Sequence, residues 1–235
     1  GNEGLFTLEF PESVKEIAPK AFYGASVGVV AFAENGSSLE RIGESAFENS
    51  SVTRVDIIGN LSKIETATFR NADKLVSVVI PDGVTYIAAE SFLGCSALAE
   101  IKLPESVKEI ANSAFKNTGL KSVNTGDGVA KIAAEAFADN KALTDLYIGK
   151  NVEKIGDKAF AGCSALVAVN LPASLKYFSA VAFDGCSALT KITVDGESKN
   201  FKSVGDIVYS ADGKTLVMVA NKNAKNVTVA KGTEV

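Results

Sequence analysis

The sequence predicts an α/β repeat protein, a solenoid of about eight rungs of 22–25 residues that stack on one another. The first observation is a set of phenylalanines that recur at this interval: Phe22, Phe47, Phe69, Phe92, Phe115, Phe137, Phe160 and Phe183. A fixed period in this range is typical of supersecondary units that bury their apolar faces on their neighbours. The phenylalanines are therefore the expected structural anchors of the core.

The second observation concerns the residues around each anchor. Isoleucine stands five residues before every anchor except the last, where Phe178 replaces it. Two residues after each anchor the chain has only Gly, Asn or Asp: Gly24, Asn49, Asn71, Gly94, Asn117, Asp139, Gly162 and Gly185. Because these residues tolerate a left-handed backbone, we expect "IANSAFKN" at Ile110–Asn117 and its equivalents to be short helical turns that end there.

The third observation is a strand pattern after each turn. "LAEIKLP" at Leu98–Pro104 alternates apolar and polar residues, which favours a half-buried strand, and "VKEI" at Val107–Ile110 is a shorter extended piece. We expect the longer strands to form a parallel sheet on the concave face. The first corner, Ala31–Ser38, is longer than the others, and Thr125 is polar in an otherwise apolar strand column.

The repeat pattern LPxSVxxIxxxAFxGCxxLxxI resembles the BspA-type leucine-rich repeat of bacterial and protist surface proteins. The resemblance covers about residues 8–194. It implies a right-handed leucine-rich-repeat solenoid in a bacterial protein that is secreted or anchored at the cell surface. Export rests on this resemblance, because the sequence itself has no signal segment and does not begin with Met.

The last 35 residues depart from the repeat. "DIVYSADGKTLVMV" at Asp206–Val219 has two strand-like runs around Asp212–Gly213, which indicates a β-hairpin. "VTVAKGTEV" at Val227–Val235 is similar to half a rung. We therefore divide the chain into the solenoid, 1–200, and a C-terminal hairpin cap with a partial repeat, 201–235, packed on the same domain.

Composition disfavours several functions. The chain has no His, its net charge is −4, and its isoelectric point is near 5.1. Without His it lacks the usual general base and the commonest metal ligand, so we expect neither an enzyme nor a metal or cofactor site. The acidic balance argues against nucleic acid, and no apolar run is long enough to insert into a membrane.

Three cysteines lie three residues after an anchor, in "FLGCSAL", "FAGCSAL" and "FDGCSAL". We expect Cys95, Cys163 and Cys186 to be small buried core residues. A disulfide between Cys163 and Cys186, on adjacent rungs, is the next alternative, although equivalent side chains should point in parallel. A nucleophilic thiolate lacks a neighbouring base.

Alternation places two columns of side chains on the outer face of the longer strands. Six of them are our candidate ligand-binding residues: Arg54, Asp56, Lys102, Asp145, Tyr147 and Lys191. The alternative is a solvated face whose charges do nothing specific. A second exposed ladder of mixed charge, from Lys15 to Lys176, suits mutual ion pairing, and Tyr86 and Tyr177 lie within it.

These observations lead to one expectation and two alternatives. We expect a monomeric, non-enzymatic extracellular module for protein interaction or adhesion, which binds a macromolecular ligand through the concave sheet face. The expected partner is a host or microbial extracellular protein, with a glycan as the alternative. The chain could instead be a structural spacer or scaffold of a longer surface protein, and a glycan-binding protein is less favoured because Trp is absent.

Overall fold

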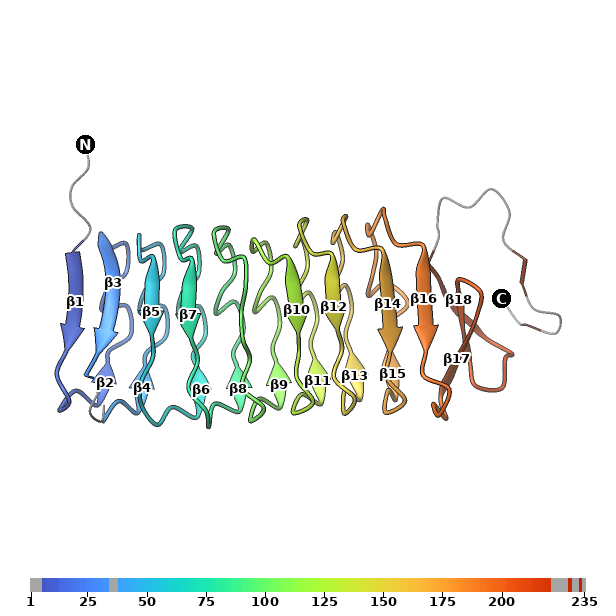
Figure 1. Cartoon of the computed structure of the whole chain (residues 1–235), viewed down its shortest axis with the longest axis horizontal. Coiled ribbons are helices and arrows are strands. Elements are labelled where there is room, and N and C mark those ends of the chain that lie inside the picture. The colour runs from blue at the N-terminus through green and yellow to red at the C-terminus, as the bar shows by residue number, and fades with distance from the viewer. Residues whose placement is uncertain (1–5, 34–37, 221–227, 230–232, 234–235) are drawn as a thin grey trace.

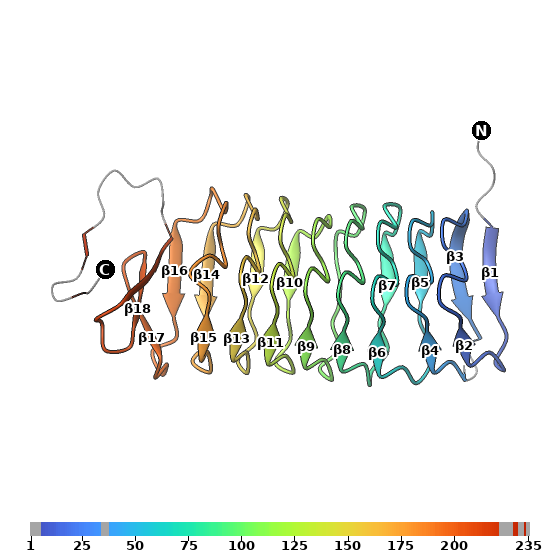
Figure 2. The ribbon, with the colours of Figure 1, turned by 180° about the vertical axis from the view of Figure 1, so that it is seen from behind.

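A computed structural model describes residues 6–33, 38–220, 228–229 and 233. Figures 1 and 2 show two rows of strands that run side by side along the long axis of the molecule. The first row, here called the long-strand face, contains β1 (Phe6–Phe10), β3 (Val27–Phe32), β5 (Arg54–Asp56), β7 (Ser77–Val79), β10 (Ser122–Asn124), β12 (Asp145–Tyr147), β14 (Ala168–Leu171) and β16 (Lys191–Val194).

The second row, here called the short-strand face, consists of two-residue strands that follow the corners. These are β2 (Glu16–Ile17), β4 (Arg41–Ile42), β6 (Lys63–Ile64), β8 (Tyr86–Ile87), β9 (Glu109–Ile110), β11 (Lys131–Ile132), β13 (Lys154–Ile155) and β15 (Tyr177–Phe178). Each "VKEI"-type segment thus supplies one short strand, with its isoleucine buried and the residue before it facing outward.

All pairing between rungs is parallel, and residues at equivalent repeat positions face each other. On the long-strand face the hydrogen-bonded order is β1-β3-β5-β7, followed by β10-β12 and β14-β16; on the short-strand face it is β2-β4 and β6-β8-β9-β11-β13-β15. Arg54 pairs with Ser77, and Val55 with Val78. This register keeps every column of the repeat intact, so the rung-on-rung solenoid is confirmed.

The core follows the anchor column through the whole solenoid. Successive anchor rings from Phe22 to Phe183 are stacked, with centroids 5.0–5.5 Å apart and planes within 18° of parallel. Seven of the eight rings are essentially inaccessible to solvent, and Phe22 at the N-terminal end is half-buried. Burial of so much aromatic surface makes this column a substantial source of stability, together with the buried Ile, Val and Leu columns around it.

The expected helical turns are wrong, since no helix occurs among the described residues. The backbone is left-handed at two positions in the first seven turns and at one in the eighth. The angle φ is 54–77° two residues after each of the eight anchors, as expected, and 53–60° two residues before the first seven. Every second backbone N–H group of a turn donates to a carbonyl of the next rung, as that of Phe115 does to Ala136 at 2.7 Å. The N–H groups between them donate to the carbonyl of the residue three positions earlier in the same turn. A helix would donate four back.

The turn segments therefore form a third ladder of hydrogen bonds between rungs. Within one turn, Ser113, Phe115 and Asn117 donate to Ala134, Ala136 and Ala138 of the next rung at 2.7–3.0 Å. This ladder satisfies backbone groups that would otherwise be buried without a partner, and it positions each anchor ring directly above the last.

The C-terminal cap is an antiparallel sheet of β17 (Phe201–Val204), β18 (Ile207–Ser210) and β19 (Leu216–Val219). The hairpin of β18 and β19 is confirmed, and β17 is a third strand that the sequence did not indicate. Val208 and Met218 join the same buried cluster as the solenoid core, and the Phe201 ring meets Phe178 edge-on at 6.3 Å.

Parts of two predictions cannot be compared with the structure. The centre of the expanded corner, residues 34–37, and most of the partial repeat at Val227–Val235 lie outside the described residues. Within the described ranges, no helix has the length and apolarity needed to cross a membrane.

Candidate binding surface

The two outward columns of the long-strand face lie where alternation places them. Pairing joins Arg54 to Ser77 and Asp56 to Val79 near one end, and Ala168 to Lys191 and Asn170 to Thr193 near the other. Buried residues such as Val55 and Val169 alternate with them. The face is therefore a regular array with one outward residue every second position along each strand.

The six candidate residues share this face but do not form one compact site. Arg54 and Asp56 are on β5, Lys102 is on the following unlabelled rung beyond β7, Asp145 and Tyr147 are on β12, and Lys191 is on β16. The Arg54 guanidinium binds the Asp56 carboxylate at 2.6 Å and 2.8 Å. These two charges neutralise each other, which leaves little net field for a ligand.

Tyr147 contacts Asp127, a residue that the repeat pattern does not single out. Its hydroxyl donates to Oδ1 of Asp127 at 2.9 Å, while the ring remains 49% exposed. Hydrogen bonds from the backbone N–H and side chain of Lys150, and then from Tyr147, lower the pKa of Asp127. The hydrogen bond to Asp127 raises the pKa of Tyr147. The Tyr147 ring is thus an exposed aromatic surface that is oriented by its hydrogen bond to Asp127. The local sequence "TGDG" does not indicate that Asp127 has this role.

Lys102, Lys191 and Glu100 differ from most charged residues of the solenoid. The structure gives none of them a hydrogen bond or an ion pair within the described part of the chain. All three are exposed on the long-strand face. An unpaired charge on a fixed strand can bind a partner without first breaking an internal contact.

The regular ladder is broken next to Lys102. Residues 99–103 form no strand, and no backbone hydrogen bond joins them to β7. On neighbouring rungs the equivalent bonds are present, from Val76 N–H to the Thr53 carbonyl at 2.8 Å and from Lys121 N–H to the Ala99 carbonyl at 3.0 Å. The bond missing from this series is the one from Ala99 N–H to the Val76 carbonyl.

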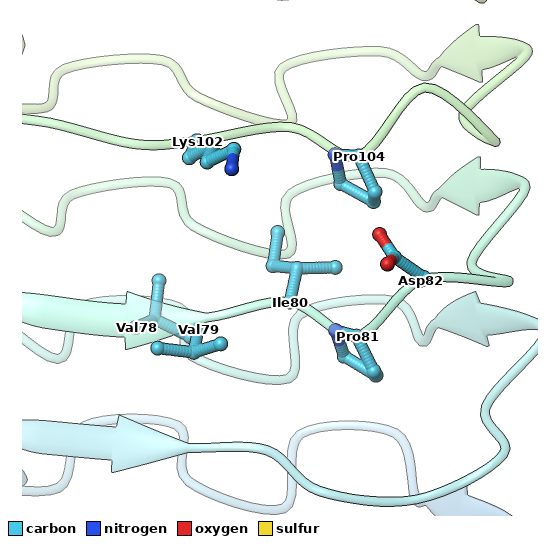
Figure 3. Close-up of a pocket in the computed structure, with 7 residues that line it drawn as sticks. All are labelled: Val78, Val79, Ile80, Pro81, Asp82, Lys102 and Pro104. Carbon is cyan, nitrogen blue, oxygen red and sulfur yellow. The ribbon is translucent and has the colours of Figure 1, made fainter.

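Two hollows of 390 Å³ and 580 Å³ lie along this break. Figure 3 shows the first, with Val79 and Ile80 on one side, Lys102 and Pro104 on the other, and Asp82 at the end. The second continues past Val76 and Glu100, and the two share Val78 and Lys102. We call the combined feature, between residues 76–82 and 99–104, the sheet-break groove.

Only a faint indication of the sheet-break groove is present in the sequence. Val76 and Val79 are 59% and 49% exposed, and the apolar run "LVSVVIP" at Leu75–Pro81 contains more apolar residues than a half-buried strand needs. The missing hydrogen bonds leave no trace in the repeat pattern, because "LAEIKLP" matches its neighbours closely.

The short-strand face offers fewer free groups. Most of its charges pair across rungs, as predicted: Arg41 with Glu16 at 2.8 Å, Lys131 with Glu109 at 2.6 Å, and Lys176 with Glu153 at 2.8 Å. Lys108 is exposed and has no ion pair within the described residues. The Lys154 ammonium lies 5.1 Å from the centre of the Tyr177 ring. Tyr177 is consequently engaged with its own ladder, although it is 48% exposed.

The three cysteines are buried and form no disulfide, so the alternative of a Cys163–Cys186 bond is not seen, and each has a structural contact. The thiols of Cys95, Cys163 and Cys186 donate to the carbonyl oxygens of Phe69, Phe137 and Phe160, one rung back, at 3.1–3.3 Å. Burial raises the pKa of Cys95, and the hydrogen bond with Cys186 and burial raise that of Cys163. The described residues contain no group of three or more acidic, Cys or His side chains that could hold a metal ion.

Comparison with known proteins agrees with this architecture. The family model described as "BspA type Leucine rich repeat region (6 copies)" matches residues 15–144 and 130–226. No curated protein matches. A leucine-rich repeat protein from Bacteroides ovatus has 27% sequence identity and a TM-score of 0.67, over 83% of this chain and 47% of that one. This chain therefore spans about half the length of that structure.

Two further solved structures are more distant. The pneumococcal vaccine antigen PcpA has 23% identity and a TM-score of 0.49, over 84% of this chain and 64% of that one. A leucine rich cell surface protein from Faecalibacterium prausnitzii has 20% identity and a TM-score of 0.40, over 83% of this chain and 74% of that one. Since the family model covers most of the sequence, the chain belongs to the BspA-type leucine-rich-repeat family.

Proposed function

We propose that this chain is a non-enzymatic module that binds an extracellular protein through its long-strand face. One observation carries the proposal, namely the contrast between the two strand faces. The short-strand face pairs most of its charges internally, whereas the long-strand face presents unpaired Glu100, Lys102 and Lys191, exposed valines and the hydrogen-bonded ring of Tyr147. Exposed aromatic and apolar groups beside free charges are typical of protein interfaces.

The contacts would be distributed along the solenoid. The candidate residues extend from β5 to β16, and repeat proteins use such extended surfaces to bind large partners. We also propose that the protein acts at the cell surface or is secreted, because the family to which it belongs is one of surface proteins. If a longer protein contains this chain, we propose the same surface-binding role for that protein.

Binding to a panel of extracellular-matrix proteins, mucins and glycans at physiological salt tests the proposal. The variant Arg54→Glu, Lys102→Glu, Tyr147→Ala should lose saturable binding to the protein members of the panel. The control variant Lys15→Glu, Lys176→Glu, on the short-strand face, should keep it. Binding to glycans alone would favour a glycan-binding protein, and no binding by the folded chain would favour the spacer.

A further inference from the structure

The sheet-break groove has the shape of a site for an extended chain. It follows the strand direction from Val76 and Ala99 at one end to Asp82 and Pro104 at the other. At about 3.3 Å per residue, the stretch from residue 76 to residue 82 is about 20 Å long. A long, shallow hollow of this kind fits a segment of five or six extended residues better than a compact small molecule.

Its walls carry backbone groups that lack protein partners. Within the described part of the chain, the structure gives the N–H groups of residues 99–103 no acceptor, and among their carbonyls only Ala99 accepts a hydrogen bond, from Lys121. The remaining donors and acceptors alternate along the chain at the spacing of an extended polypeptide. A polypeptide backbone has the same alternation, which sugars and nucleic acids do not share.

Side chains around the groove define what such a segment would carry. Val76 and Val79 are exposed and form apolar walls with Pro81, so an apolar side chain would be desolvated there. Lys102 borders both hollows and has no ion-pair partner within the described residues. Asp82 and Glu100 line one hollow each and likewise have no ion-pair partner within the described residues. The Lys102 ammonium therefore favours a single carboxylate beside it, and the two acidic residues disfavour any further acidic group on the bound segment.

We propose that the sheet-break groove binds an extended polypeptide segment that places an apolar side chain against Val76 and Val79 and an acidic side chain beside Lys102. This rests on the proposed function and assigns the partner's binding mode, main-chain hydrogen bonding to an interrupted parallel sheet. The short-strand ladder remains continuous behind the groove through β6, β8 and β9, so the rungs stay joined while the segment binds.

Selection of phage-displayed random heptapeptides on the 235-residue chain tests this proposal. The enriched sequences should combine an apolar and an acidic residue, and the synthetic peptides are then titrated by fluorescence polarisation. Val76→Arg should weaken binding at least tenfold. Val167→Arg is the matched control, because Val167 holds the same repeat position on the Phe160 rung and is similarly exposed, 53% against 59%. It should change binding less than twofold.

Two further measurements separate the proposed contacts from a general loss of structure. Lys102→Glu should weaken the selected peptides, and replacing their acidic residue with Lys should restore binding to that variant. Peptides N-methylated at alternate backbone amides should bind at least tenfold more weakly. Failure to enrich any peptide, or equal binding by Val76→Arg and the wild type, would overturn the proposal.

The outcomes also distinguish this inference from the proposed function. If panel proteins bind the long-strand face but are insensitive to Val76→Arg, the face is a binding surface and the groove assignment is wrong. If the selected peptides bind the groove while no panel protein binds, the groove assignment stands and the proposed class of partner is wrong.

Discussion

Nδ2 of Asn140 lies 2.8 Å from the carbonyl oxygen of Phe115, one rung away, and donates a hydrogen bond to it. The same nitrogen also donates to the Phe137 carbonyl on its own rung at 2.8 Å. The side-chain oxygen accepts from the N–H and the hydroxyl of Thr118. A fully buried amide thus joins two rungs with both its ends satisfied.

Asn140→Ala should lower the free energy of unfolding by about 2–4 kcal/mol, because it leaves the Thr118 hydroxyl and two carbonyl oxygens with fewer partners in the core. Urea denaturation followed by circular dichroism measures the change. Asn170→Ala, on the exposed side of β14, is the control and should stay within about 0.5 kcal/mol of the wild type. Equal effects of the two substitutions would contradict the bridging role.

The anchor column predicts a difference between its middle and its end. Phe115→Ala should cost about 3–5 kcal/mol, since the ring is fully buried between two stacked neighbours. Phe22→Ala should cost less, because Phe22 is half-buried. Thermal unfolding of the two variants compares them, and a larger loss at Phe22 would show that the end rungs, not the central stack, limit stability.

The left-handed turns predict an unusual response to glycine. Ser113 has a φ of 55°, so Ser113→Gly should raise the free energy of unfolding by up to about 1 kcal/mol by relieving this backbone conformation. In a helix the same change would be destabilising. Ser122→Gly, in the extended strand β10, should be destabilising and serves as the control for the loss of a serine side chain. Destabilisation by Ser113→Gly in urea melts would support a helical turn instead.

The buried thiols predict a pH dependence. Burial raises the pKa of Cys95, so its contribution to stability is fully present below the ordinary thiol pKa, near 8.5, and is lost as pH rises above it. Between pH 7.5 and 9.5 the wild type should therefore lose more stability than Cys95→Ala. Urea midpoints at the two pH values measure this difference. Rapid modification of all three cysteines in native protein by a thiol reagent would contradict their burial.

Much of the solenoid could be predicted because each structural position of the repeat occurs eight times in the sequence. The anchor stack, the isoleucine column and the outward columns of the long strands are all visible as columns of similar residues. The mixed-charge ladder was likewise predicted to pair internally, and most of it does, as Arg41 does with Glu16. Thr125 shows how an exception is accommodated, because its buried hydroxyl accepts the Gly149 N–H at 2.9 Å.

The turns were wrong for a specific reason. Two residues before the first seven anchors, where φ is positive, the chain has Lys, Ser, Ala or Glu, and none of these types signals a left-handed backbone. The third ladder between rungs imposes that conformation, through bonds such as Lys20 N–H to the Glu44 carbonyl at 3.0 Å. Tertiary hydrogen bonding therefore overrides local preference here.

The candidate surface was predicted as two columns, but not its important details. Asp127, which orients Tyr147, belongs to a different rung and contacts it only in the folded chain. The sheet-break groove arises from hydrogen bonds that are missing, and missing contacts leave the residue pattern of Leu98–Pro104 unchanged. Repetition thus predicts what the rungs share, while the groove is a feature of one rung.

Amine-reactive footprinting of the chain with and without a protein partner from the binding panel tests the central claim most directly. Lys102 and Lys191 report the long-strand face, and Lys15 and Lys176 report the short-strand face, all four being exposed. The account predicts that binding reduces the labelling of Lys102 and Lys191 at least threefold and leaves Lys15 and Lys176 unchanged. Protection of Lys15 and Lys176 with continued labelling of Lys102 and Lys191 would show that the partner binds the opposite face.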